Sequence, residues 1–63
     1  MEFYETGPLN KEQFGEFVTF FDEHIGTDYE VNEDPDLEGK VYIVCFELEP
    51  KDVRMLEDFE NNL

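Results

Sequence analysis

Cys45 and His24 are the only cysteine and the only histidine in the chain, so they form its one candidate pair for nucleophilic catalysis. Such catalysis needs a base within hydrogen-bond reach of the nucleophile and a third group that orients the base. Cys45 stands in the middle of an apolar run, where a thiol usually packs as a small hydrophobic group. His24 falls in the last turn of a predicted helix, where a cation favours the helix dipole. We therefore expect both residues to be structural and the protein not to be an enzyme.

Acidic residues at alternate positions, Asp34, Asp36 and Glu38, are followed by Gly39, and this pattern resembles the start of an EF-hand calcium loop. The last ligand position of such a loop would be Cys45, where calcium requires a bidentate glutamate. No glycine-rich phosphate-binding loop is present either. The sequence thus predicts no specific metal site and no cofactor.

The charge balance is the strongest signal in the sequence. Eighteen Asp and Glu against four Lys and Arg give a formal net charge of -14. A chain of this charge repels phosphates, so we reject direct binding to DNA or RNA. Solubility alone would need a net charge of magnitude about 2–8 in a small domain. Seven Phe and three Tyr argue against disorder, so we expect a folded domain with an anionic surface.

Several carboxylates have spacings similar to those of successive phosphates on a nucleic-acid strand. Glu12 and Glu16 are four residues apart on a predicted helix, a rise of about 6 Å. Asp28 and Glu30 alternate on a predicted strand, about 6.8 Å apart. The residues predicted to bind a partner are Glu12, Glu16, Asp22, Glu23, Asp28, Glu30, Glu33, Asp34, Asp36 and Glu38.

These features favour a small acidic inhibitor that mimics nucleic acid and blocks a basic DNA- or RNA-binding protein. In size and composition the chain is similar to small acidic proteins encoded by phages and mobile elements. The alternative is a regulatory or structural adaptor that docks through an exposed apolar sheet face or an edge strand. Rising salt should weaken the complex of a mimic steeply and that of an adaptor far less.

The element that must position these residues is the run 40–48, whose β-branched and aromatic composition predicts a central strand. Asn10 and Gln13 predict a capping box at the start of a helix over residues 10–25, and Gly26 ends it. Pro50 predicts the first turn of a second helix over residues 50–61. Shorter strands are predicted at residues 1–5 and 27–32, and a loop at residues 33–39.

The resulting order, β-α-β-β-α, predicts a single small α+β domain spanning residues 1–63. We expect a two-layer sandwich in which a three-stranded antiparallel sheet of order 1-3-2 carries both helices on one face. The sequence shows no signal peptide and no apolar run near 18 residues. We therefore expect a soluble cytoplasmic protein without a membrane partner.

Such a sheet leaves one face uncovered. Alternation along the central strand places Val41, Ile43 and Cys45 on one side, and we assign them, beside Tyr4, to the uncovered face. The predicted helix-covered side then carries Tyr42, Val44, Phe46 and Leu48. An exposed apolar face and an unpaired first strand both favour association, so we predict a homodimer through one of them.

Overall fold

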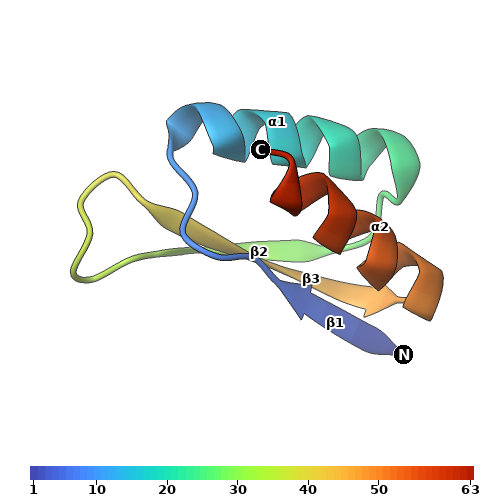
Figure 1. Ribbon diagram of the computed structural model, residues 1–63. Helices are drawn as coiled ribbons and strands as arrows, with labels where there is room; N and C mark the ends of the chain where they lie inside the picture. The colour runs from blue at the N-terminus through green and yellow to red at the C-terminus, as the bar shows by residue number, and fades with distance from the viewer.

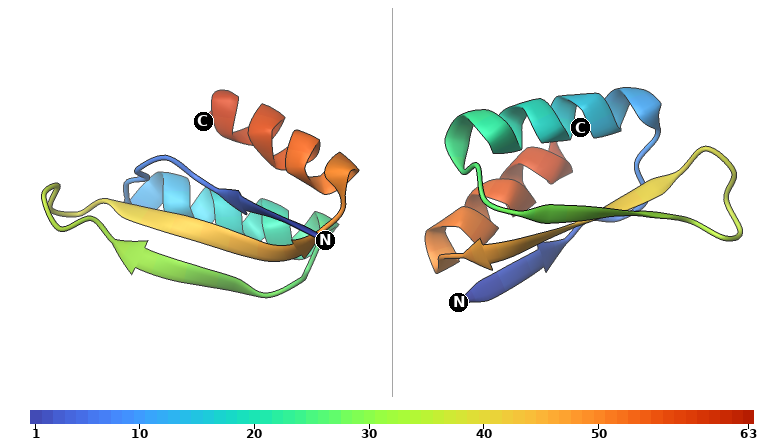
Figure 2. Two further views of the ribbon diagram at one scale, coloured as in Figure 1. Left: turned by 90° about the horizontal axis from the view of Figure 1, so that it is seen from below. Right: turned by 180° about the vertical axis from the view of Figure 1, so that it is seen from behind.

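The computed structural model describes all residues, 1–63, and has the predicted order of elements (Figure 1). They are β1 (Glu2–Glu5), α1 (Lys11–His24), β2 (Tyr29–Glu33), β3 (Val41–Leu48) and α2 (Pro50–Asn61). The strands form one antiparallel sheet in the order β1-β3-β2, with β3 in the centre. Both helices lie on the same side of the sheet (Figure 2). The predicted α+β fold is confirmed.

Local signals in the sequence account for the bounds of α1. The Asn10 side chain accepts a hydrogen bond from the Gln13 backbone N–H at 2.8 Å, and the Gln13 side chain accepts one from the Asn10 N–H at 3.0 Å. This reciprocal capping box satisfies two donors that the first helical turn leaves free. At the other end Gly26 has a φ of 76°, which glycine adopts without a Cβ penalty, and its N–H donates to the Phe21 carbonyl.

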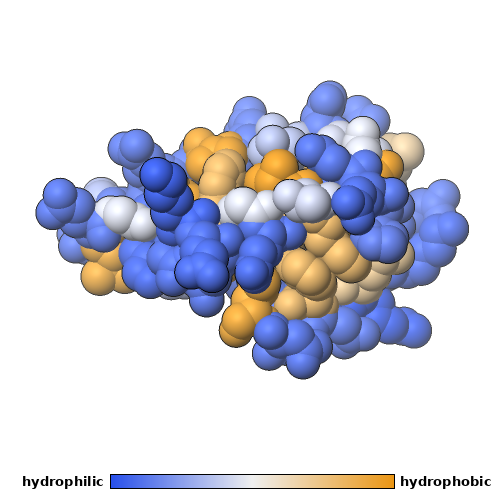
Figure 3. All heavy atoms as spheres, turned by 90° about the horizontal axis from the view of Figure 1, so that it is seen from above, coloured by the Kyte–Doolittle hydropathy of each residue, from blue (hydrophilic) through white to orange (hydrophobic).

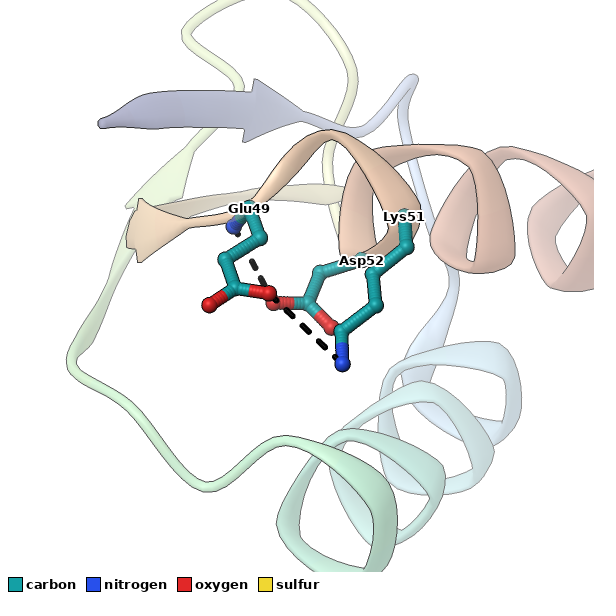
Figure 4. Close-up of polar contacts among 3 residues, drawn as sticks. All are labelled: Glu49, Lys51 and Asp52. Atoms are coloured by element: carbon teal, nitrogen blue, oxygen red, sulfur yellow. Dashed lines mark hydrogen bonds and ion pairs between the residues drawn. The ribbon is translucent and has the colours of Figure 1, made fainter.

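The second helix begins at Pro50, whose missing N–H costs nothing in the first turn. The Glu49 backbone N–H donates to Asp52 Oδ2 at 3.1 Å, which ties the chain back onto the helix (Figure 4). Lys51 Nζ lies 3.6 Å from Glu49 Oε2 in the same turn. Neither helix of the protein has the length and apolar character needed to cross a bilayer.

The core lies between the helices and the sheet. Its buried side chains come from both layers and from the segment before α1: Leu9, Phe17, Phe21, Ile43, Cys45, Leu48 and Leu56. Phe17 meets Phe59 of α2 edge-on at 6.2 Å, and Phe21 meets Tyr29 of β2 edge-on at 5.6 Å. Such offset aromatic pairs add about 0.5–1.5 kcal/mol each beyond the area they bury.

The assignment of the two faces of β3 was wrong. Ile43 is 1% exposed and Cys45 0% exposed, because both lie beneath the helices. Val41 packs against the same core, and so does Tyr4. The four residues predicted for a dimer interface thus belong to the helix-covered face.

Two features of the backbone decide this. The hairpin pairs Tyr29 with Cys45 and Val31 with Ile43, so the apolar positions of β2 share their face with the odd-numbered positions of β3. In addition β3 has two residues, Phe46 and Glu47, where β1 has only Phe3. This β-bulge, with Glu47 at a φ of 57°, turns Leu48 to the covered side. The uncovered face therefore carries Tyr42, Val44 and Phe46.

Polar contacts hold β1 and its following segment in place. The Thr6 N–H donates to the Ile43 carbonyl, and the Ile43 N–H donates to Thr6 Oγ1, both at 3.0 Å. The Glu60 carboxylate of α2 accepts from the Tyr4 hydroxyl and, at 2.7 Å, from the Gly7 N–H. Glu60 thus links the last turn of α2 to β1 by two charge-assisted hydrogen bonds.

Candidate functional site

Cys45 and His24 lie in very different surroundings. Cys45 is a free thiol in the core, and burial raises its pKa to about 11. It is therefore protonated at neutral pH, whereas attack on a substrate requires the thiolate. His24 is exposed at the end of α1, where its ring lies tilted against Phe20 with centroids 4.4 Å apart. No hydrogen bond joins Cys45 to His24, and each side chain only packs against its own neighbours.

The loop after β2 is organised around Asp34. Its Oδ1 accepts from the backbone N–H groups of Asp36 at 2.8 Å and Leu37 at 3.0 Å, and its Oδ2 accepts from the Tyr42 hydroxyl. These bonds, with the bond from Tyr42 foremost, hold the pKa of Asp34 below its usual 3.8. The hydrogen bond to Asp34 is also the main cause that raises the pKa of Tyr42 above its usual 10.0. Asp34 therefore serves to shape the loop, a role that the sequence did not reveal.

The loop carboxylates do not form a metal site. Glu33, Asp34, Asp36 and Glu38 line one shallow hollow together with Lys40. No group of three or more His, Cys, Asp or Glu side chains is arranged to hold a metal ion. What the hollow offers is an exposed cluster of negative charge at one end of the molecule, where the loop projects beyond the sheet (Figure 1).

The ten predicted partner-binding carboxylates fall on three separate surfaces. Four line the hollow just described, with Glu33 at the end of β2 and the other three in the loop. Glu12, Glu16, Asp22 and Glu23 are exposed on α1, in the helical layer. Asp28 and Glu30 belong to the opposite side, where they line a hollow with Phe3 and Phe46. A partner that contacts one flat surface can therefore meet only part of the set.

Almost all of this charge is uncompensated. The pair between Lys51 and Glu49 is the only ion pair in the structure, and both side chains are largely exposed (Figure 4). An exposed pair of this kind contributes about 0–1 kcal/mol. The other acidic side chains have no cationic partner within the chain, so the field of the molecule is negative on both layers.

An aromatic stack with a hollow on either side lies between the helices. Phe20 of α1 stacks on Phe59 of α2 with ring centroids 4.1 Å apart and planes 11° from parallel. Gly15 and Thr19 flank this stack on α1, and Met55 flanks it on α2. The helix side shows apolar spheres framed by hydrophilic ones (Figure 3). Phe20 is half-buried and packs between the two helices.

The uncovered face of the sheet combines apolar and acidic groups; the sequence predicted an apolar uncovered face but not these residues on it. Val44 lies between Glu5 of β1 and Glu30 of β2, which are its direct cross-strand partners. Phe46 follows two residues later, beside Phe3, which is 65% exposed. No helix lies over this side (Figure 2). We call the surface of Tyr42, Val44, Phe46 and Phe3, with the carboxylates on either side, the open face.

A signal for the open face was present in the sequence. Residues 29 and 31 are the apolar positions of β2, and they must face the helices because positions 28, 30 and 32 are polar. Because the loop is centred on Leu37, the hairpin pairs odd-numbered residues of β2 with odd-numbered residues of β3. That register places the even-numbered residues of β3 on the open side.

Comparison of the chain with protein-family models, with curated protein sequences and with solved structures gave no match.

Proposed function

We propose that the protein is a small acidic inhibitor that mimics nucleic acid and blocks a basic DNA- or RNA-binding protein. The observation that carries the proposal is a net charge of -14, of which a single exposed ion pair compensates almost nothing within the chain. Self-repulsion of this size destabilises a compact domain. A densely basic partner relieves it, and complementary fields also accelerate the encounter.

The role that we propose is not catalytic. The one thiol is protonated in the core, and most carboxylates are exposed where water screens them. Catalytic carboxylates need environments that push their pKa values apart. The molecule itself would not bind nucleic acid, since its charge has the same sign as that of the phosphates.

The test uses duplex nucleic acid as a competitor. The tagged protein is immobilised, loaded at low salt with a lysate of the source organism, and eluted with short duplex DNA or with RNA at constant ionic strength. We expect the eluted partner to be a nucleic-acid-binding protein, and we expect its binding to labelled DNA or RNA to fall when the acidic protein is added. A partner that stays bound under excess nucleic acid, and that still binds its own DNA or RNA in the complex, would refute the mimic.

Two matched variants locate the charge that matters. One replaces two loop carboxylates, Asp36→Asn with Glu38→Gln; the other replaces two on α2, Asp58→Asn with Glu57→Gln. All four side chains are exposed, and each pair changes the net charge from -14 to -12. Asp34 is left intact because it shapes the loop. We expect the loop pair to weaken binding more than the α2 pair; equal effects would mean that only net charge acts.

A second candidate function is an adaptor that docks through the open face. It is favoured by the exposure of Phe3 and of Met1, which is 97% exposed, beside the partly exposed Phe46. Exposed apolar patches of this kind often mark protein interaction sites. An adaptor complex held by these groups should persist as salt rises, whereas the mimic's complex should dissociate.

A further inference from the structure

We propose that the open face is a docking surface for a basic amphipathic α-helix of the partner, an inference that rests on the proposed function because it names the part of the basic target that is bound. The apolar floor and the acidic walls of this face have the dimensions of one helix. Many DNA-binding proteins place an α-helix in the major groove. The open face would then offer this helix a binding groove in place of the major groove of DNA.

The floor of this groove is the even-numbered row of β3. Tyr42, Val44 and Phe46 follow each other at steps of about 6.8 Å, because alternate residues of a strand face the same side. Phe3 widens the floor at the Phe46 end. Residues four apart on a helix rise about 6 Å. A stripe of apolar side chains at helical spacing therefore matches this row over about two and a half turns.

The walls are glutamates on the two flanking strands. Glu5 of β1 and Glu30 of β2 oppose Val44 from either side, and both are exposed. Neighbouring strands are about 4.8 Å apart, so the two outer backbones are separated by about 9.6 Å. An α-helix with its side chains is about 10–12 Å wide, and the major groove of B-DNA is about 12 Å wide. Lys or Arg on the flanks of a docked helix would meet carboxylates on both sides.

Charge favours a basic helix over a second copy of this chain as the occupant. A face-to-face dimer would bring Glu5 and Glu30 of two molecules together, with Asp28 and Glu47 at the margins. Such like-charge contacts oppose association. A helix with basic flanks neutralises the same carboxylates and also covers the exposed Phe3.

The test uses a defined probe in place of the unidentified partner. The probe is a labelled helical peptide of Leu and Lys in which Leu occupies one face, and its control is a scrambled peptide of the same composition. Fluorescence anisotropy at physiological salt measures the affinity of both peptides for the intact protein. We expect the amphipathic peptide to bind and the scrambled peptide to bind at least about tenfold more weakly, a difference of about 1.4 kcal/mol. Equal binding of the two peptides, or no binding of the amphipathic one, would overturn the proposal.

Paired variants separate the open face from net charge. Glu5→Gln with Glu30→Gln removes the charge of both walls, and Asp58→Asn with Glu57→Gln removes two exposed carboxylates of α2 that take no part in the open face. We expect the first pair of substitutions to weaken binding of the amphipathic peptide about tenfold, near 1.4 kcal/mol. The second pair should change the affinity of this peptide less than about twofold. Circular-dichroism melts confirm that both variants are folded. Equal losses in the two pairs would contradict docking between the walls.

Amide NMR shifts of the unmodified protein give a readout that needs no variant. We expect the peptide to shift the amides of β3 and of Phe3, and to leave those near Phe20 and Phe59 unchanged. If the shifts gather at the loop or between the helices, docking on the open face is refuted, while competition with nucleic acid remains a separate test of the mimic. A dimer at neutral pH with its open face protected would also refute the proposal.

Discussion

The substitution Phe21→Ala tests the packing of α1 on the sheet. Phe21 is 1% exposed and meets Tyr29 edge-on. Removing a buried phenylalanine ring costs about 3–5 kcal/mol. At about 0.05–0.15 kcal/mol per residue, the free energy of unfolding of a 63-residue domain is about 3–9 kcal/mol. The substitution therefore removes most of the stability, and we expect a largely unfolded protein at low salt.

The matched control is Phe3→Ala, which deletes the same ring from a position that is 65% exposed. Surface substitutions usually change stability by less than about 0.5 kcal/mol. Urea unfolding followed by far-UV circular dichroism measures both variants. For a small domain, with a slope of about 1 kcal/mol per molar urea, a loss of about 3 kcal/mol lowers the midpoint by about 3 M. Similar midpoints for the two variants would show that α1 does not bury Phe21 against β2.

Three further predictions concern the core and its titrating groups. Ile43→Glu should unfold the protein, because it places a carboxylate beneath the helices; if circular dichroism shows the variant to be folded, Ile43 must lie on an exposed face. Cys45 should react with a thiol reagent only as fast as the protein opens, since its side chain is 0% exposed and burial also raises its pKa to about 11; fast labelling of the native protein, at the rate seen in denaturant, would contradict this. Tyr4→Phe should cost about 1–3 kcal/mol at neutral pH by removing the hydrogen bond to Glu60. Burial, followed by Glu60, raises the pKa of Tyr4 above its usual 10.0, so the contribution of the hydroxyl is complete below pH 10.0 and is lost as the pH rises through the folded-state value. The stability difference between the parent and Tyr4→Phe should therefore shrink above pH 10.0; a difference that grows there would reverse the sign of this linkage.

Local chemistry allowed the elements to be predicted from the sequence. The capping box at Asn10, the left-handed glycine at position 26 and the proline at position 50 each act within one turn of chain. Their effects do not depend on distant contacts. The element order and the most apolar strand then led to the sheet order 1-3-2, which is confirmed.

The two faces of β3 were harder to distinguish, because both are apolar and nothing within the strand marks the buried side. The register of the hairpin and the bulge at Glu47 decide it, and both depend on pairing between strands. The number of carboxylates was plain in the sequence. Their division among the loop, α1 and the open face was not, and neither was the internal role of Asp34, which depends on the Tyr42 hydroxyl.

The salt dependence of partner binding tests the central claim most directly. If the acidic surface replaces nucleic acid in a basic site, the logarithm of the affinity should fall steeply and linearly with the logarithm of the salt concentration, as it does for phosphate contacts. Asp36→Asn with Glu38→Gln should make that slope shallower than Asp58→Asn with Glu57→Gln does. An affinity that barely changes with salt, in the parent and in both variants, would contradict the account.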